Sequence, residues 1–247
     1  MWDDVLLFVA VGFAAQLVDG SVGMAYGLTG TTMLLSFGVP PATASACVHA
    51  AEVFTTGASG VAHWRLGNVH GDLIRRLAIP GMIGGAAGAY LLATLPGEKL
   101  RPLISAYLMV MGAVILWRAV RKLPTQAEPP KRLTVLGLGG GFLDAIGGGG
   151  WGPMVASTLI GQGTTPRFAI GSVNLAEFFV TTIITGTFIF TIGLQLWPII
   201  AGLILGGVLA APFAAYATKQ LPDQPMMILV GTVIILLSIR GVLQAVG

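Results

Sequence analysis

GFLDAIGGGGWGP, residues 141–153, places four consecutive glycines and the carboxylate of Asp144 inside an apolar run. Glycine in a helix interior costs about 1 kcal/mol relative to alanine, so Gly147–Gly150 is predicted to interrupt a helix and leave peptide N–H groups bare. At membrane depth, bare peptide groups persist only where they line a cavity or bind a ligand. We therefore expect that the helix is interrupted at these glycines and that the exposed N–H groups bind a ligand or line a cavity.

An earlier copy of this stretch lies 125 residues upstream, where Asp19 corresponds to Asp144 and Tyr26 to Trp151. The register continues along the chain with an offset of 125 or 126, and further matched pairs are Gly23 and Gly148, Gly27 and Gly152, Glu52 and Glu177, Thr56 and Thr181, and Tyr90 and Tyr216. The chain is therefore predicted to be a tandem duplication, with a first repeat at 1–120, a linker at 121–132 and a second repeat at 133–247.

The composition is that of a polytopic membrane protein. Of 247 residues, 55% are hydrophobic and only 9% are charged, and the mean hydropathy is +0.85. A soluble domain or a disordered chain is excluded by these values. The net charge of +3 comes from basic residues in short loops, which is typical of topology signals rather than of a nucleic-acid site. We expect no nucleic-acid partner.

Each repeat is predicted to contain a re-entrant helical hairpin followed by three full transmembrane helices, in an all-α fold. The first two apolar stretches, 4–18 and 24–37, have 15 and 14 residues, whereas a full span needs roughly 20. They are interpreted as hairpin arms with the tip at Asp19–Gly23, although such arms could instead nearly span the membrane. The other predicted elements are spans 42–62, 77–94 and 100–118, hairpin arms 133–146 and 151–162, and spans 166–190, 197–218 and 224–243.

Charge predicts that the two repeats have opposite orientations. The loop 65–76 carries three arginines, whereas its counterpart 191–196 carries no charge. Basic loops stay in the cytoplasm, so the repeats are predicted to be inverted about an axis in the membrane plane, as in many secondary transporters. The protein is therefore expected to lie in the cell inner membrane with both termini on the periplasmic side. The cytoplasmic side then holds ten basic residues: Arg65, Arg75, Arg76, Arg118, Arg121, Lys122, Lys131, Arg132, Arg167 and Lys219.

Four carboxylates lie within apolar segments: Asp19 and Asp144 at the hairpin tips, and Glu52 and Glu177 at the centres of the first full spans. A charge at the membrane centre costs about 3 kcal/mol on insertion scales, so these acids are functional candidates. They could carry a coupled proton or hold the hairpins in place. The tip aspartates also suit the capping of helix N-termini.

His49 and Asn174 each lie three residues before one of these glutamates, so each pair shares a helix face. No Lys or Arg lies mid-span, so a bound anion would need peptide N–H groups and the positive helix ends near Met24 and Trp151. The candidate substrate-binding residues are Ser21, Gly23, Tyr26, His49, Gly148, Gly149, Gly150, Trp151 and Asn174. No ATP-binding loop, metal-ligand set or nucleophile–base pair is recognisable, so we expect no cofactor, no metal and no enzymatic activity.

The motifs DAIGGGGWGP (144–153), IGSVNLAEFF (170–179) and HWRLGNV (63–69) resemble the sulfite exporter TauE/SafE family of membrane proteins, and the resemblance covers nearly the whole chain. It implies a bacterial inner-membrane carrier whose partner is a small sulfur anion such as sulfite, thiosulfate or sulfoacetate. The first repeat departs from the glycine-rich pattern, since residues 19–27 read DGSVGMAYG.

The residues alone leave two rival functions open. One is a carrier, coupled to cations or protons, that uses the four acids. The other is a membrane enzyme or assembly partner, for which Cys47 is the only recognisable nucleophile. A homodimer is a further candidate assembly.

Overall fold

The structure, a computed structural model, describes residues 5–24, 26–95, 132–156 and 164–217, with isolated positions between 106 and 121, 158 and 162, and 224 and 239. This part of the chain is helical and contains no strand, which confirms the all-α class. The elements are α1 (Val5–Val22), α2 (Tyr26–Ser36), α3 (Pro41–Arg65), α4 (Gly71–Thr94), α6 (Leu133–Gly147), the short π-helical turn η1 (Gly152–Ala156), α8 (Pro166–Thr191) and α9 (Trp197–Ala217).

The two longest helices, α3 and α8, begin and end with the same signals. Each starts at a proline, Pro41 or Pro166, which suits the first turn because the N–H that proline lacks would have no helical partner there. Each is followed by a glycine with positive φ, Gly67 at 68° and Gly193 at 72°, whose N–H bonds back to the last turn. These matched boundaries are what the duplication predicts.

The helices are broken at both predicted tips. In the second half, α6 ends at Gly147, and the chain turns through Gly148 and Gly149 with φ of 65° and 153°. In the first half, α1 continues past Asp19 to Val22, and the turn comes at Gly23 with φ of 76°. The predicted tip, Asp19–Gly23, thus contains the turn at its last residue, whereas Asp19–Val22 are still helical.

The predicted spans agree with the described helices apart from some ends. α4 begins at Gly71 rather than at residue 77, and its first two turns carry the exposed Arg75 and Arg76. Three described helices are long and apolar enough to cross a membrane: α4, α8 from Arg167, and α9. The predicted spans 100–118 and 224–243 and the linker 121–132 lie outside the described residues, apart from isolated positions.

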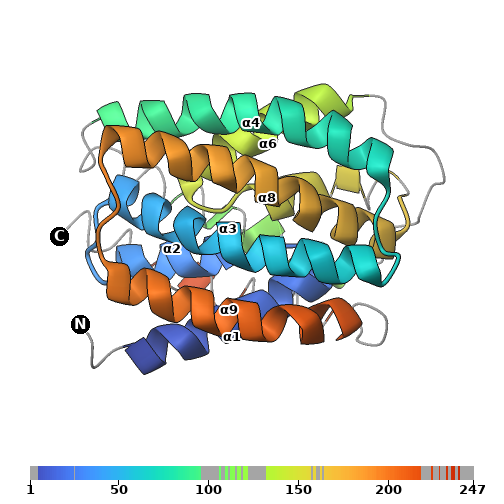
Figure 1. Cartoon of the computed structure of the whole chain (residues 1–247), viewed down its shortest axis with the longest axis horizontal. Coiled ribbons are helices and arrows are strands. Elements are labelled where there is room, and N and C mark those ends of the chain that lie inside the picture. The colour runs from blue at the N-terminus through green and yellow to red at the C-terminus, as the bar shows by residue number, and fades with distance from the viewer. Residues whose placement is uncertain are drawn as a thin grey trace.

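The helices lie side by side along the long axis of the molecule (Figure 1). α4 and α6 form one edge, α1 and α9 form the other, and α3 and α8 lie between them. α1 corresponds to α6 and α4 to α9 in the duplication, so the contact of α1 with α9 repeats the contact of α6 with α4. Each half thus packs the first arm of its hairpin against a helix of the other half, and the halves are interlocked.

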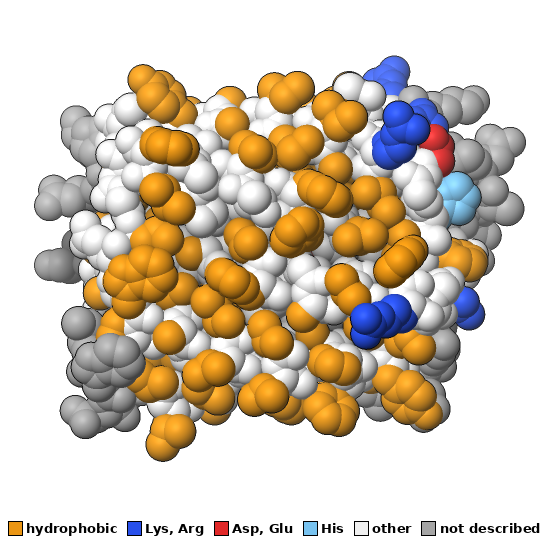
Figure 2. All heavy atoms as spheres, viewed as in Figure 1, with side chains coloured by type: hydrophobic (Ala, Val, Ile, Leu, Met, Phe, Trp, Pro, Cys, Tyr) orange, Lys and Arg blue, Asp and Glu red, His pale blue; other side chains and the backbone are white. Residues whose placement is uncertain are grey.

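The surface is divided into an apolar belt and a polar end. Figure 2 shows hydrophobic side chains over most of the face in view, with arginine, aspartate and histidine gathered at one end. At this end the turn after α3 meets the start of α8, where Arg167 donates a 3.0 Å hydrogen bond to the carbonyl oxygen of Gly67. The polar residues of α3, in contrast, are buried between its neighbours.

Candidate functional site

The two helix breaks, from opposite halves of the chain, meet at one point. Thr31 of α2 donates a 2.6 Å hydrogen bond to the carbonyl oxygen of Gly148. A Cβ added to Gly149 would collide with the backbone of Gly27 and Leu28. Only glycine allows this approach of backbone to backbone, so the glycine run serves the contact between the tips as well as the turn itself.

Asp144 caps the second tip. Its Oδ1 accepts hydrogen bonds from the N–H groups of Gly150, at 2.7 Å, and Trp151, at 3.0 Å. Its carbonyl oxygen accepts the N–H of Gly149 at 3.2 Å. The prediction that these N–H groups are bare is therefore wrong for this conformation, because the helix-capping role considered for the tip aspartates is the one observed.

The first tip has a cap of the same kind. Asp19 is 3% exposed, and its Oδ1 accepts the N–H of Tyr26 at the long distance of 3.5 Å. The hydroxyl of Ser21 donates to the carbonyl oxygen of Leu17 at 2.6 Å, within its own helix. The glycine run that folds back on Asp144 is absent from the first repeat.

The two matched aromatic residues anchor their hairpins to neighbouring helices: Tyr26 bonds α9 of the other half, whereas Trp151 bonds α8 of its own half. The Tyr26 hydroxyl donates to the carbonyl oxygen of Leu203 at 2.9 Å, and Trp151 Nε1 donates to that of Val173 at 3.3 Å. Both rings are fully buried. Their polar atoms are therefore bonded to protein backbone in this conformation.

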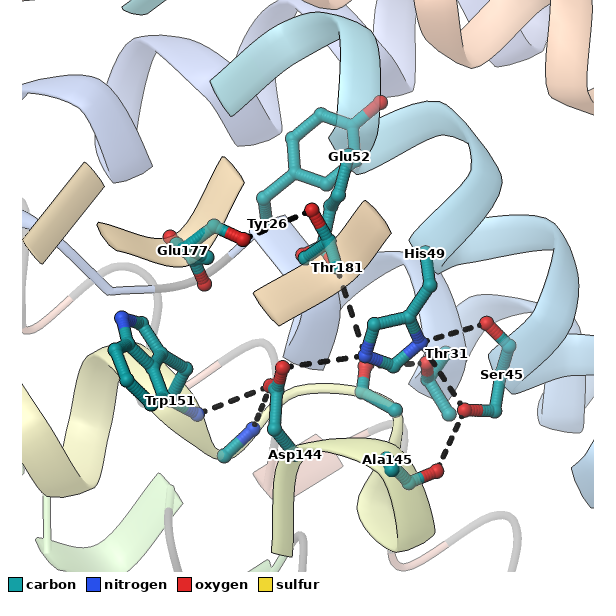
Figure 3. A network of polar contacts seen from close by, with 12 residues as sticks. Tyr26, Thr31, Ser45, His49, Glu52, Asp144, Ala145, Trp151, Glu177 and Thr181 are labelled. Carbon is teal, nitrogen blue, oxygen red and sulfur yellow. Dashed lines mark hydrogen bonds and ion pairs between the residues drawn. The ribbon is translucent and has the colours of Figure 1, made fainter. Parts of the chain in front are cut away.

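His49 connects α3 to the second tip (Figure 3). Its Nε2 lies 3.2 Å from Asp144 Oδ2 and 3.8 Å from Glu52 Oε2. Its Nδ1 lies 2.8 Å from the carbonyl oxygen of Ser45 and 3.1 Å from the Ser45 hydroxyl. That hydroxyl donates to the carbonyl oxygen of Ala145 at 2.7 Å. One turn of α3 thus binds the end of α6 at two points.

Asn174 is placed differently from its counterpart His49. Its Oδ1 accepts the Ser59 hydroxyl at 2.9 Å, and its Nδ2 donates to the carbonyl oxygen of Ile170 at 3.1 Å. These bonds place the side chain between α3 and α8. The two residues occupy matched positions in the repeats but make different contacts in this conformation.

All four predicted acids converge on one small cavity. It measures about 10 Å³, about the space of one water molecule, and is lined by Asp19, Gly27, Leu28, Glu52, Asp144, Gly149, Gly152, Pro153 and Glu177. Three pairs in this lining are duplicates of one another: the aspartates, the glutamates, and Gly27 with Gly152. A buried cluster of four carboxylates needs protons or a cation to offset its charge.

One part of this cluster has the composition of a metal site. His49, Glu52 and Asp144 each offer one ligand atom, and these atoms lie within 4.8 Å of one another. The absence of a metal stays a prediction. Cys47, the candidate nucleophile, is buried, and its thiol donates to the carbonyl oxygen of Gln195 at 3.3 Å.

Sequence reasoning missed Ser45, Thr31 and Ser59, which hold the tips and the central helices together. A signal for Ser45 was present, because it lies four residues before His49 and therefore on the same helix face. Thr31 lies four residues after Gly27 in the same way. Hydroxyl residues are frequent in membrane helices, however, and spacing alone does not separate a bond across the halves from a bond within one helix.

The family model of the sulfite exporter TauE/SafE family matches residues 8–241. The chain belongs to this family. A TauE/SafE member is a multi-pass membrane transporter, and the resemblance seen in the sequence motifs is confirmed. The probable membrane transporter protein YtnM of Bacillus subtilis (strain 168) is 41% identical over 248 residues, which cover 97% of this chain and 83% of that protein. No solved structure matches this TauE/SafE protein.

Proposed function

We propose that this protein is a secondary transporter that moves sulfite, or a related sulfur oxyanion or organosulfonate, across the bacterial inner membrane by alternating access. The anion binds between the two hairpin tips near the membrane midplane. The observation that carries this proposal is the direct contact of the two hairpins, where Thr31 in the second arm of the first bonds Gly148 at the tip of the second.

The N–H groups of Gly150 and Trp151 supply the binding chemistry. In this conformation they hold the Asp144 carboxylate, which is itself an oxyanion of the kind that a sulfonate or sulfite presents. A substrate oxyanion uses the same donors once Asp144 moves away. His49 and the residues of the first tip, Ser21, Gly23 and Tyr26, complete the proposed site.

An inverted repeat provides the alternating access. In Figure 1, α3 runs from left to right and α8 runs from right to left, as opposite orientations of the two halves require. Arg132 and Val135, at the start of α6, line one surface cavity together with Thr158 and Gln162, so the second hairpin returns to the end where it begins. The cavity between the four acids is too small for sulfite, so in this proposal the two hairpins move apart for the anion to bind.

The arginines fix the orientation in this proposal. Arg65 ends α3, and Arg75 and Arg76 lie near the start of α4, so all three are at the end of the molecule where α3 connects to α4 (Figure 1). Basic ends face the cytoplasm, so this end is cytoplasmic and both termini are periplasmic.

A cation carrier is the second candidate, and the cluster of His49, Glu52 and Asp144 favours it. Thermal unfolding of the purified protein in detergent separates the two. The panel comprises sulfite, thiosulfate, sulfoacetate, sulfate, acetate and divalent cations. A ligand that binds the folded state alone adds about 2.7 kcal/mol of stability at a hundredfold excess over its Kd. Selective stabilisation by a sulfur anion supports the proposed transporter, and stabilisation by cations alone replaces it with the cation carrier.

A further inference from the structure

A buried amide on α1 lacks a bonding partner. Gln16 is fully buried, and neither its Nε2 nor its Oε1 makes a hydrogen bond within the part of the chain that the structure describes. A carboxamide can donate two hydrogen bonds and accept others, so a buried one without partners costs stability. Native proteins rarely keep such a group unless it has a role. In a protein with several conformations, a ligand can supply the partners in another one.

The amide of Gln16 lies close to polar groups of two other helices. A Cβ placed on Gly20, one turn further along α1, would lie 3.1 Å from Gln16 Nε2 and 3.4 Å from Ser59 Oγ of α3. Because Gly20 has no side chain, the amide and the hydroxyl border the same space. The Ser59 hydroxyl donates a 2.9 Å hydrogen bond to Asn174 Oδ1 of α8. Gln16, Ser59 and Asn174 are all fully buried, so three helices share one polar cluster.

This cluster lies on a polar row that leads away from the cavity lined by the four acids. Along α3, Glu52, Thr56, Ser59 and His63 follow one another at spacings of three or four residues, which places them on one face of the helix. All of them are buried. Glu52 lines the cavity, and the row ends next to Arg65, where α3 connects to α4. The row therefore extends from the cavity to the end of the molecule that the proposed orientation places in the cytoplasm.

We propose, on the basis of the anion transport proposed above, that Gln16, Ser59 and Asn174 form a second binding site for the sulfur oxyanion, between the hairpin tips and the cytoplasm. Gln16 Nε2 donates to one oxygen of the anion, and the Ser59 hydroxyl, which can rotate, donates to another. Gln16 Oε1 accepts from a water molecule bound to the anion. The site therefore suits an anion that keeps part of its hydration.

The packing around Gly20 explains how this site opens and closes. Ala214 Cβ of α9 lies 2.6 Å from the position of a Cβ on Gly20, so α9 fills the space beside the amide in this conformation. α1 leads directly into the turn of the first hairpin at Gly23. A movement that separates the two hairpins therefore also moves Gln16 relative to α3 and α9. The anion that leaves the tips then meets the amide on its way to the cytoplasm.

The second half of the chain does not repeat this cluster. In the register of the duplication, Gln16 corresponds to Gly141 and Ser59 to Ile184. Gly141 packs against the backbone of Gly81, where a Cβ would collide with the carbonyl oxygen, and Ile184 is a fully buried apolar residue. Neither side chain can hydrogen-bond an anion. The second site is therefore expected on the cytoplasmic side only.

The test compares transport from the two sides of the membrane. Gln16→Met removes the amide and keeps the length of an unbranched side chain. Exchange of radiolabelled thiosulfate is measured in right-side-out and inside-out vesicles that contain the full chain, from a host without thiosulfate transport of its own. Loss of one hydrogen bond to a charged ligand is expected to raise the KM at the cytoplasmic face by about tenfold and at the periplasmic face by less than about twofold. Gln195→Met, in the exposed turn between α8 and α9, keeps both wild-type values.

Thermal unfolding distinguishes a binding role of the amide from a packing role. Because the amide makes no hydrogen bond in the folded protein, Gln16→Met is expected to melt at the wild-type temperature or above it. A lower melting temperature, with a KM raised equally at both faces, assigns the amide to packing and overturns the inference. If Gln16→Met does not fold, Gln16→Leu is measured in the same way. Failure of both variants to fold means that the fold requires the amide, which also overturns the inference.

The outcomes separate this site from the transport function itself. Absence of wild-type exchange with thiosulfate, sulfite and sulfoacetate alike removes the proposed function. Wild-type exchange with an unchanged cytoplasmic KM in Gln16→Met means that the amide binds water at most, which overturns the second site and leaves the function standing. A KM that rises at the periplasmic face alone also overturns the site.

Discussion

The Thr31 hydroxyl donates a 2.6 Å hydrogen bond to the carbonyl oxygen of Gly148, a residue 117 positions away in the sequence. This bond joins the second arm of one hairpin to the tip of the other. The adjacent Thr32 is equally buried but donates to the carbonyl oxygen of Leu28 in its own helix. The two threonines therefore offer a matched test of the contact between the tips.

Thr31→Val is expected to cost about 1–3 kcal/mol of stability, because it leaves the Gly148 carbonyl oxygen buried without its partner. Thr32→Val should cost about 1 kcal/mol or less, since the Leu28 carbonyl keeps its helical partner. Thermal unfolding in detergent measures both losses. Equal losses in the two variants contradict a structural role for the bond between the tips.

Gly149→Ala is expected to destabilise the protein by more than about 1 kcal/mol, because the new methyl group meets the backbone of Gly27 and Leu28 and φ is 153°. Gly186→Ala is the control, since a Cβ in the middle of α8 meets open space there. That change should raise stability by up to about 1 kcal/mol. Melting temperatures and the yield of folded protein report both effects, and a harmless Gly149→Ala means that the tips are further apart.

The proposed inverted topology predicts from which side of the membrane each position can be labelled. In a Cys47→Ser background, cysteines at Arg75 and Arg167 should react with an impermeant maleimide from the cytoplasmic side. A cysteine at Gln195, in the exposed turn between α8 and α9, should react only from the periplasmic side. Labelling of intact cells and of inside-out vesicles provides the measurement. If Arg75→Cys and Gln195→Cys are labelled from the same side, the proposed orientation of the repeats is wrong.

Ser59→Ala and Asn174→Ala are expected to be non-additive, because each removes the same 2.9 Å hydrogen bond between α3 and α8. A coupling energy of about 1 kcal/mol is expected from a double-mutant cycle of unfolding free energies. Ser59→Ala with Thr94→Val is the control, since the exposed Thr94 hydroxyl bonds only within its own helix. Additive losses for Ser59 and Asn174 refute this contact.

Sequence reasoning located the two breaks and the four acids, because a duplicated glycine turn and buried carboxylates both violate the ordinary pattern of a membrane helix. It did not predict where the Asp144 carboxylate points. The positive φ values at Gly148 and Gly149 fold the chain back so that Gly150 and Trp151 reach Asp144. A glycine run permits such a turn but also permits others, so the partner of these N–H groups could not be predicted from the sequence.

The first tip and the polar pairing of α3 show a second limit. Asp19 suggested a helix end, yet α1 continues to Val22 because nothing between them forces a turn before Gly23. The repeats match His49 with Asn174, but their contacts differ, because His49 reaches the Asp144 carboxylate and Asn174 bonds Ser59. Sequence symmetry therefore predicted the helices better than the contacts of their side chains.

The first arm of each hairpin packs against a helix of the other half, and this arrangement affects how the protein folds during synthesis. α1 emerges from the ribosome first, yet its packing partner α9 ends only at Ala217. Contacts so distant in sequence form late, so the first hairpin enters the bilayer before its protein neighbour exists. For most of its synthesis, the nascent chain therefore lacks the helix against which α1 packs. A truncation before α9 therefore leaves the first hairpin exposed to lipid, where the quality-control system of the membrane would recognise it as incompletely folded.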